Sequence, residues 1–392
     1  MPAGEDETHF DVLHVTPRLG RCGGGVWHFV NDLALAQAEA GQRVAVVGLD
    51  CDHLGTDAQS LREHDGVHLE VATETKTPLP ALGYSPDLAA RLDRLAARSD
   101  LIHAHGGLRM WTLSPVRRAA QKHGRPLMLA THGGLYPWLL NRNRFKKRLL
   151  YHTLDRPNLA AVDRLHVTCE QELGFCRDYG LDQPAAVVPP GVRPLPRGDA
   201  DRWRVAHPEL AGRRLCGFLG YFDRKKGLLK LVRSWANQSS DDWHLVIAGH
   251  DQRGHQAELE REIEQLGLGG RVTILGPQVH DAKVDFLAAI ELFVLPTDWE
   301  NFGVVVGESL AAGVPVVTTT NTPWRWLNDA QAGWCVEPTQ RAVDESLANA
   351  LRRSRDELTE MGERGRQRIA TDYSWSKAVE QLAEFTRQPA ER

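Results

Sequence analysis

The sequence has no long hydrophobic run, and none of its apolar segments approaches the roughly 18 residues that a membrane-spanning helix requires. Its first residues, Met-Pro-Ala-Gly-Glu-Asp-Glu-Thr, are acidic and lack the apolar stretch of a secretory signal peptide. We therefore expect a cytoplasmic protein that neither crosses a membrane nor is secreted.

Cysteine is scarce, with six residues among 392 and no Cys-x-x-Cys pair. The six are Cys22, Cys51, Cys169, Cys176, Cys216 and Cys335. Their scattered spacing lacks the pattern of a structural zinc site and does not suggest a disulfide framework. We expect free thiols in a reducing compartment.

The chain also lacks an excess of basic residues. Its 47 lysines and arginines are outnumbered by 51 aspartates and glutamates, and the formal net charge is −4. No global attraction to nucleic acid follows, so a polyanion would have to bind at a local site. The length of 392 residues exceeds one ordinary domain and suits two domains of roughly 180 residues each.

Short apolar segments alternate with helical segments along the first half of the chain. The predicted strands are residues 10–15, 44–48, 101–104, 127–130, 164–168 and 186–188, and the predicted helices include residues 87–97 and 113–121. Apolar strands of this kind, separated by helices, indicate a parallel sheet covered on both faces. Residues 189–198, which are rich in proline and glycine, then mark a domain boundary.

The same alternation starts again after this boundary. The predicted strands are residues 215–220, 244–248, 271–275 and 292–295, and the predicted helices are residues 227–235, 256–266 and 283–289. From residue 345 the chain is helical in pattern, and a last helix begins near Tyr373-Ser-Trp375. The predicted fold class is α/β, with a first domain over residues 1–190, a second over 191–372 and a final helix over 373–392.

One stretch, residues 296–317, joins a strand, a loop, a helix and the next strand. The loop reads Pro296-Thr-Asp-Trp-Glu300-Asn-Phe-Gly303, and Gly303 opens the helix. The amide groups and the macrodipole at a helix amino terminus favour an anion. Glu300 and Glu308 flank this terminus, and carboxylates accept hydrogen bonds from sugar hydroxyls. The stretch therefore predicts a site for a phosphorylated, polyhydroxylated ligand.

The spacing of these glutamates, with Asn-Phe-Gly after the first and Glu-Ser-Leu-Ala-Ala-Gly-Val-Pro-Val around the second, resembles the retaining glycosyltransferases of family 4. Further matches follow in the expected order and extend the resemblance over nearly the whole chain. They are Gly23-Gly24-Gly25-Val26, Thr131-His132-Gly133, Pro189-Pro-Gly191-Val192, Lys226-Gly227, Thr322-Pro-Trp324 and Gly333-Trp334. The last two are similar to features of bacterial polysaccharide and lipopolysaccharide members.

This resemblance implies the GT-B fold, in which two facing Rossmann-like domains with parallel sheets bind acceptor and nucleotide-sugar donor, and the last helix crosses back to the first domain. It implies retaining transfer of a hexosyl group from a nucleoside-diphosphate sugar to a glycan or lipid-linked acceptor in envelope polysaccharide or lipopolysaccharide synthesis. No divalent metal or other cofactor is expected, because Lys226, Arg224 and the helix amino terminus would neutralise the departing diphosphate.

The resemblance also implies a set of site residues. His132 and Glu300 are the expected catalytic residues, and Glu308 is expected to hold the nucleotide ribose. The expected donor-binding residues are Gly24, Gly25, Arg224, Lys226, Asn301, Phe302, Gly303, Val304 and Glu308. One departure from the family stands out, because Tyr221 follows Gly220 where the family has an arginine. Either Arg224 or Lys225 replaces that bidentate anion contact, or the donor pocket is altered.

Two functions from other classes remain open. Asp50 ends the second predicted strand, as the ribose-binding acid of an NAD-dependent oxidoreductase would, but the first glycine loop does not match G-x-G-x-x-G. The other alternative is a non-catalytic module that binds a sugar nucleotide.

Two short patterns offer metal ligands. Asp50-Cys-Asp52 is similar to the metal-binding motif of glycosyltransferases of another fold class, which two Rossmann-like halves do not suit. His103-x-His105 places two imidazoles on one face of a strand, but no carboxylate lies nearby in the sequence. We therefore expect no metal site.

Residues 141–150, Asn-Arg-Asn-Arg-Phe-Lys-Lys-Arg-Leu-Leu, contain five cations and no acid. A helix here would be basic with an apolar edge, and such helices bind anionic membrane surfaces. The resemblance to enzymes with lipid-linked acceptors favours peripheral binding at the inner face of the plasma membrane. The expected membrane or acceptor contacts are Arg144, Lys146, Lys147 and Arg148. A solvated helix packed on the sheet is the alternative.

Overall fold

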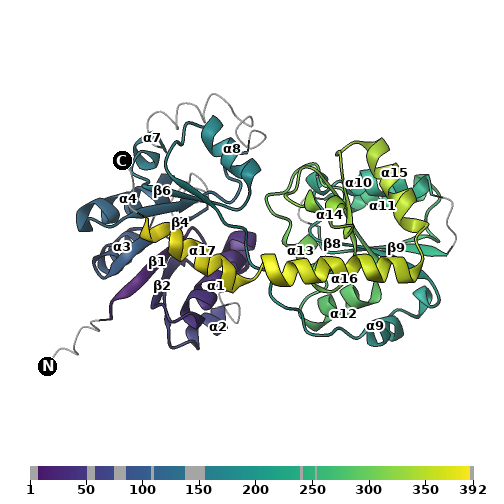
Figure 1. Cartoon of the computed structure of the whole chain (residues 1–392), viewed down its shortest axis with the longest axis horizontal. Helices are drawn as coiled ribbons and strands as arrows, with labels where there is room; N and C mark the ends of the chain where they lie inside the picture. Colours follow the sequence, from purple (N-terminus) through teal and green to yellow (C-terminus); the bar gives the residue numbers. More distant parts are fainter. Residues whose placement is uncertain are drawn as a thin grey trace. The chain divides into compact units, whose positions relative to one another are not determined.

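The computed structural model describes residues 8–50, 58–74, 85–106, 110–136, 155–238, 242–251 and 254–388. The chain divides into two compact units. Unit 1 contains Met1–Gly191 together with Trp375–Arg392, and unit 2 contains Val192–Ser374. Each unit is an α/β structure built on one parallel sheet (Figure 1).

Unit 1 is built on a seven-stranded parallel sheet with the order β3-β2-β1-β4-β5-β6-β7. Its strands are β1 Phe10–Thr16, β2 Val44–Leu49, β3 Val67–Ala72, β4 Ser99–His105, β5 Leu127–Ala130, β6 Arg164–Val167 and β7 Ala185–Val187. Its helices are η1 Gly20–Gly23, α1 Gly24–Glu39, α2 Gln59–Arg62, α3 Pro86–Ala97, α4 Met110–His123, α7 Arg156–Leu159, α8 Glu170–Asp178 and α17 Trp375–Arg387.

Both faces of this sheet are buried, which explains the apolar strands. Val44 and Val46 belong to the core under α1 and α17, whereas Ala45 and Val47 belong to the core under α3 and α4. Figure 1 shows the last helix, α17 in yellow, beside α1, and contacts join these two helices. Successive side chains of a strand point to opposite faces of the sheet. Because helices cover both faces here, a strand has no polar side that faces solvent.

Unit 2 is built on a six-stranded parallel sheet with the order β10-β9-β8-β11-β12-β13. Its strands are β8 Arg214–Leu219, β9 Trp243–Ala248, β10 Val272–Leu275, β11 Leu292–Leu295, β12 Val316–Thr319 and β13 Gly333–Val336. Its helices are α9 Ala200–Ala206, η5 Pro208–Leu210, η6 Arg224–Lys226, α10 Leu228–Ala236, α11 Gln256–Gln265, α12 Asp281–Ala289, α13 Val304–Ala311, α14 Trp326–Asp329, α15 Gln340–Leu351 and α16 Arg355–Asp372.

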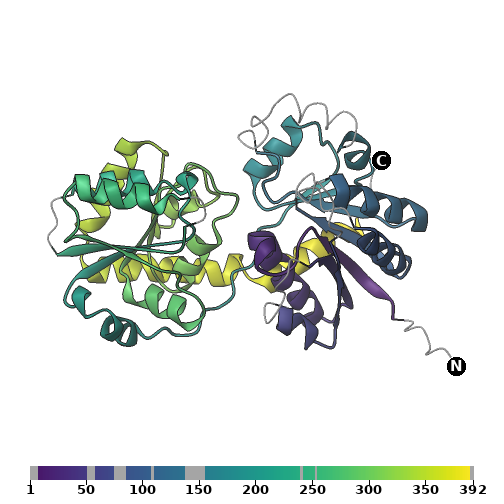
Figure 2. The same cartoon turned by 180° about the vertical axis from the view of Figure 1, so that it is seen from behind.

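The helices of unit 2 also cover both faces of the sheet. In Figure 1, α10, α11 and α15 lie on one face, with α9, α12 and α16 on the other, and Figure 2 shows the same layers from behind. The predicted fold class, with two parallel-sheet Rossmann-like domains, is confirmed. Two strands were missed, β3 and β13, because each is a sheet edge whose side chains are partly exposed and give a weak apolar signal.

The expectation of free thiols was wrong at one position. Cys22, in η1, is disulfide-bonded, whereas the other described cysteines, Cys169, Cys176, Cys216 and Cys335, are buried thiols outside any disulfide. Scattered spacing in the sequence gave no sign of this pairing. Among the described helices, none has the length and hydropathy needed to cross a bilayer.

Candidate functional site

The candidate site in unit 2 lies at the point where the order of strands in its parallel sheet reverses, between β8 and β11. β8 and β11 are neighbours in the sheet although distant in sequence, so the connections that follow them leave toward opposite sides. Open parallel sheets bind ligands outside the carboxyl ends of strands at such a point. The loop after β8 contains Lys226, and the loop after β11 contains Glu300.

Direct hydrogen bonds join these two loops. The Thr297 hydroxyl donates to the Lys225 carbonyl at 2.8 Å, and the Asp298 amide donates to the same oxygen at 2.7 Å. Gly227 has φ of 73°, and a Cβ at this position would lie 2.1 Å from the Pro296 carbonyl oxygen. The close approach of the two backbones therefore requires glycine at position 227.

Lys226 and Glu300 form an ion pair, in which the lysine ammonium donates to the carboxylate. Only 12% of the lysine side chain and 15% of the glutamate side chain are exposed. Burial raises the pKa of Glu300, but the attraction of Lys226 and Lys225 outweighs burial, and the net pKa is below its ordinary value. The carboxylate is therefore charged at neutral pH.

Gly303 ends the same loop with φ of 75° and precedes α13. The loop is held by Trp324, whose indole N–H donates to the Phe302 carbonyl at 2.6 Å, and the Phe302 side chain is buried. Val304, at the first position of the helix, is exposed. The backbone from Asn301 to Val304 is thus fixed at a helix amino terminus, where anions are favoured.

Glu308 lies further along α13 and pairs with Lys283 of α12 at 2.6 Å. Sequence reasoning missed Lys283, because a lysine on a separate helix gives no local signal. Two carboxylates of the predicted site, Glu300 and Glu308, are therefore each paired with a lysine. Either lysine could pair with an anionic ligand instead.

Arg224 lies in η6 and pairs with Glu258 of α11 at 2.9 Å, with 78% of its side chain exposed. Tyr221, which stands at the position of the family arginine, is 40% exposed and packs edge-on against His250, with ring centroids 4.5 Å apart. Lys225 lies over the Trp299 ring at 4.6 Å. The replacement of the missing arginine by Arg224 or Lys225 therefore stays a prediction.

The glycine loop of unit 1 follows β1, beside the corresponding change of direction between β1 and β4. A Cβ at Gly23 would lie 2.4 Å from the Arg18 carbonyl oxygen, so glycine is needed there for packing. Gly24 and Gly25 begin α1, and a Cβ at either position would meet no atom within 4 Å. Packing does not explain these two glycines, and their role in donor binding stays a prediction.

His132 follows β5 in the turn Thr131-His132-Gly133 and has φ of 48°, an uncommon value for a non-glycine residue. Glu172 holds this turn by accepting from the Thr131 hydroxyl at 2.7 Å and from the Gly133 amide at 2.5 Å. Burial lowers the pKa of His132 to about 4, although the Glu172 charge opposes the shift. At neutral pH the imidazole is therefore uncharged, able to donate through one nitrogen and accept through the other.

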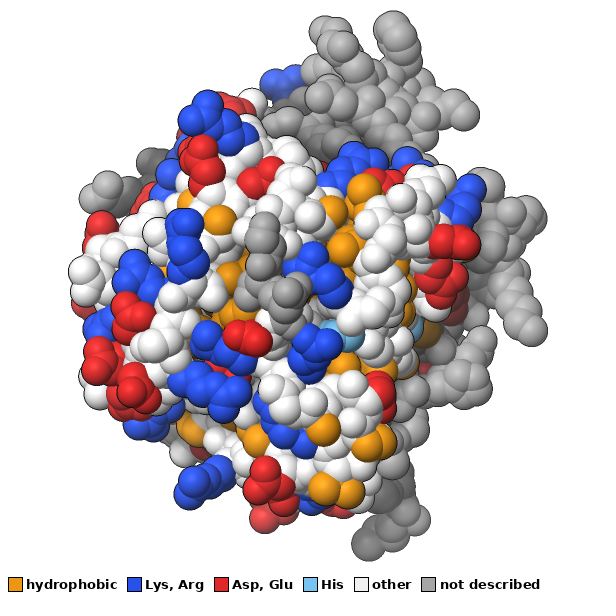
Figure 3. Space-filling model, turned by 90° about the vertical axis from the view of Figure 1, so that its right-hand side faces the viewer, with side chains coloured by type: hydrophobic (Ala, Val, Ile, Leu, Met, Phe, Trp, Pro, Cys, Tyr) orange, Lys and Arg blue, Asp and Glu red, His pale blue; other side chains and the backbone are white. Residues whose placement is uncertain are grey.

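Several predicted residues lie outside the described part of the chain. These are Arg144, Lys146, Lys147, Arg148 and Asp52. Asp50 directly follows β2 and is half-buried. On the face drawn in Figure 3, basic and acidic side chains are intermixed, and hydrophobic ones are scattered among them.

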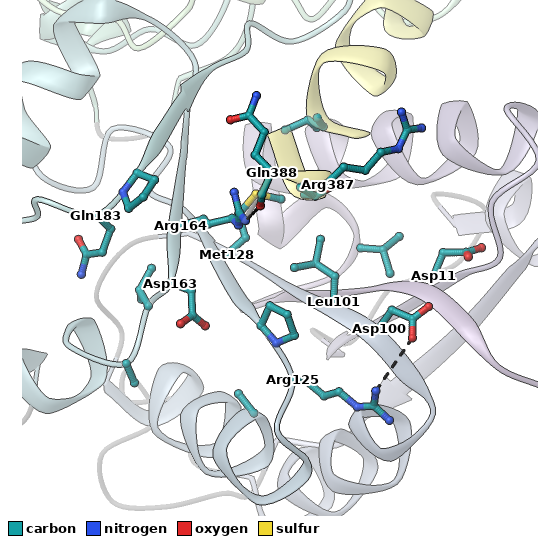
Figure 4. Close-up of a pocket in the computed structure, with 18 of the residues that line it drawn as sticks. Asp11, Asp100, Leu101, Arg125, Met128, Asp163, Arg164, Gln183, Arg387 and Gln388 are labelled. Carbon is teal, nitrogen blue, oxygen red and sulfur yellow. Dashed lines mark hydrogen bonds and ion pairs between the residues drawn. The ribbon is translucent and has the colours of Figure 1, made fainter. Parts of the chain in front are cut away.

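A cavity of about 1270 Å³ occupies a different part of unit 1 (Figure 4). It is lined by residues at the amino ends of strands, among them Asp11, Leu101 and Arg164, and by Gln388 beyond α17. Arg164 donates to the backbone carbonyl of Gln388 there. Because α/β sheets bind their ligands at the carboxyl ends of strands, we do not assign the functional site to this cavity.

Comparison with known families covers both units. A family model described as "Glycosyl transferase 4-like domain" matches residues 24–191, and one described as "Glycosyl transferases group 1" matches residues 199–368. The GDP-mannose:cellobiosyl-diphosphopolyprenol alpha-mannosyltransferase of Xanthomonas oryzae is 24% identical over 88% of each chain. The lipopolysaccharide core biosynthesis mannosyltransferase LpsB of Rhizobium meliloti is 30% identical over 36% of this chain and 41% of its own.

Among solved structures, Anabaena HepE in complex with UDP and glucose matches with a TM-score of 0.76 and 19% identity, covering 96% of this chain and 99% of HepE. This likeness shows a common fold over both units.

Proposed function

Because this chain belongs to glycosyltransferase family 4 and has the GT-B fold, we propose that it is a retaining enzyme that transfers a hexosyl group from a nucleoside-diphosphate sugar. The proposed acceptor is a glycan or a lipid-linked glycan in envelope polysaccharide or lipopolysaccharide synthesis. One mannosyltransferase relative is named for a cellobiosyl-diphosphopolyprenol acceptor and another for lipopolysaccharide core biosynthesis, and these names support the choice of acceptor.

The buried Lys226–Glu300 pair at the carboxyl ends of β8 and β11 is the observation that carries the donor site. A nucleoside diphosphate that departs from the sugar gains negative charge, which fixed cations and helix dipoles stabilise. Lys226 would pair with the diphosphate instead of with Glu300, and the diphosphate would also contact the backbone at Gly303. Glu300 would then accept hydrogen bonds from hydroxyls of the transferred sugar.

Glu308 and Lys283 are proposed to serve the other end of the donor. Glu308 would accept hydrogen bonds from the ribose hydroxyls, as the family resemblance implies. Its present partner, Lys283, holds the carboxylate in position on α13. His132 is proposed to contact the transferred sugar or the acceptor from unit 1 as a neutral imidazole.

Divalent metal ions are proposed to have no part in holding the diphosphate. Lys226 and the amino terminus of α13 supply positive charge without one. Transfer should therefore proceed equally with and without added Mg²⁺ or Mn²⁺. A strict requirement for added Mn²⁺ would contradict this proposal.

The primary test has two stages. First, thermal unfolding is measured with UDP, GDP and ADP, because a ligand at about 100 times its Kd stabilises the folded state by about 2.7 kcal/mol. Second, the stabilising nucleotide is supplied as its common sugar conjugates, and hydrolysis and transfer are followed, with the anomeric configuration of the product read by NMR. Inversion would refute retention, and binding without hydrolysis or transfer would favour a non-catalytic binding module.

Membrane binding is proposed on the basic residues 141–150. Vesicles containing anionic lipid should carry the protein down at low salt and lose it at high salt. Replacing Arg144, Lys146, Lys147 and Arg148 by glutamine should abolish this binding while nucleotide affinity stays the same. A wild-type protein that never binds such vesicles would favour a soluble acceptor.

A further inference from the structure

Unit 1 buries a group of histidines on one face of its sheet. His14 comes from β1, His103 and His105 come from β4, and His166 comes from β6. The sheet register pairs His14 with His103, and it places His105 and His166 on either side of Ala130 of β5. These four side chains are buried, with exposed fractions of 0 to 3%.

Three of these histidines converge. In the described part of the chain, His14, His103 and His105 each offer one ring nitrogen within 4.8 Å of the others. The rings of His103 and His105 have centroids 4.0 Å apart. Such convergence of three imidazoles is a donor set for a transition metal ion.

Each of these three rings has one nitrogen hydrogen-bonded to a residue other than the three converging histidines. His14 Nε2 bonds to the Gln37 side-chain oxygen at 2.6 Å, and His105 Nδ1 bonds to His132 Nε2 at 3.0 Å. His103 Nε2 bonds to His166 Nδ1 at 3.2 Å, and His166 in turn donates to the Val188 carbonyl at 3.0 Å. Metal-binding histidines are usually oriented by such outer hydrogen bonds.

These outer bonds leave His14 Nδ1, His103 Nδ1 and His105 Nε2 as the nitrogens without an outer partner. His14 Nδ1 and His105 Nε2 lie 2.8 Å apart and share a hydrogen bond. His103 Nδ1 is buried and has no hydrogen-bond partner in the described structure. A buried nitrogen without a partner is costly, and a bound cation would satisfy its lone pair.

The geometry points to a zinc site, in which His14 Nδ1, His103 Nδ1 and His105 Nε2 coordinate one Zn²⁺ and a water molecule completes a tetrahedron. Three imidazoles without a thiolate or carboxylate suit this ion. Zinc–nitrogen bonds of about 2.1 Å would separate the nitrogens by about 3.4 Å. The close His14–His105 pair would open slightly, and His103 would join it.

The competing arrangement is the same hydrogen-bonded network without an ion, in which His103 Nδ1 remains unsatisfied.

This inference departs from the expectation of no metal. The pair His103-x-His105 was visible in the sequence, but the third ligand, His14, comes from another strand. The zinc site does not depend on the proposed function, because it lies in unit 1, whereas the diphosphate is assigned to unit 2. It adjoins the proposed site through the hydrogen bond between His105 Nδ1 and His132 Nε2.

The experiment uses the full chain, produced without a histidine tag. After addition of zinc and removal of excess by dialysis, elemental analysis should find about one zinc per chain. Tetrahedral Co²⁺ in its place should give the strong visible absorption of that geometry. Wild-type protein that retains far less than one zinc per chain, and whose thermal unfolding zinc does not change, would overturn the site.

Variants make the assignment specific. His103→Gln and His14→Gln should each lose the zinc and the zinc-dependent rise in Tm. His244→Gln is the matched control, because His244 is a largely buried strand histidine of unit 2 that hydrogen-bonds Thr273. Circular dichroism establishes that each variant is folded, and zinc retention by a folded His103→Gln protein would refute its role as a ligand. The wild-type zinc and cobalt measurements stand even if a variant does not fold.

Discussion

The strand order reverses in the same way in both sheets, but the side chains near that point are uncharged in unit 1 and charged in unit 2. In unit 1, β1 and β4 hold buried histidines that are neutral and bond to one another. In unit 2, the loops after β8 and β11 hold lysine and glutamate in a nearly buried ion pair. In both units the topology places these groups where the strand order reverses, and we expect the residues there to determine which ligand binds.

Counter-charge explains the difference. Glu300 stays ionised because the charge of Lys226 lowers its pKa, and an anionic ligand could replace Glu300 as the partner of Lys226. For His103 and His105 of unit 1, no described carboxylate offsets burial, which therefore favours their uncharged form. A charged site is suited to a diphosphate, whereas a neutral imidazole site is suited to a hydroxyl or a metal ion.

The largest expected effect comes from removing the charge of Lys226 in unit 2. Lys226→Met should lower kcat/KM by about three orders of magnitude, because the diphosphate loses a fixed charge and Glu300 is left nearly buried without its lysine. Arg341→Met is the control and should change kcat/KM by less than about threefold, since its exposed pair with Glu345 on α15 contributes little. Equal losses in the two variants would contradict the assignment of Lys226.

The contact between the two loops of unit 2 can be broken separately. Gly227→Ala should lower the free energy of unfolding by about 3 kcal/mol, because the new Cβ would collide with the Pro296 carbonyl and φ is positive. Gly212→Ala has a similar φ of 76° but open space around it, so its loss should be about 1 kcal/mol. Urea denaturation measures both, and indistinguishable losses would show that the collision is relieved.

The two carboxylates of unit 2 should separate in their effects. Glu300→Gln should lower kcat by about 10- to 100-fold with little change in nucleotide affinity, because Glu300 is assigned to the sugar. Glu308→Gln should weaken nucleoside-diphosphate binding by about tenfold, because Glu308 is assigned to the ribose. Calorimetry and steady-state kinetics test the pair, and near-wild-type behaviour of both would refute the assignment.

The smallest expected effect is on acid stability. The folded-state pKa of Glu300 is below its ordinary value of 4.5, so its contribution to stability is present above that pH and is lost as pH falls through the folded pKa. The difference in urea midpoint between wild type and Glu300→Gln should therefore shrink on acidification from about pH 7 to about pH 3. A constant difference would mean that the pKa of Glu300 is the same in the folded and unfolded states.

Local patterns in the sequence were enough for the fold class and for the helix start after Gly303. Alternating strands and helices predicted two doubly covered sheets, because side-chain burial on a strand leaves its mark on consecutive residues. Gly303 was placed correctly at the start of a helix, because its left-handed backbone strongly favours glycine. The edge strands β3 and β13 escaped notice, since partial exposure weakens the same signal.

Only the tertiary structure could decide which side chains meet. Lys283 pairs with Glu308 across two helices, Arg224 pairs with Glu258, and His14 joins His103 and His105 through the pairing of β1 with β4. None of these contacts follows from spacing along the chain, because strand register and helix packing set distances between residues that are remote in sequence. The sequence by itself determined which chemical groups were available, and the fold determined which of them share a site.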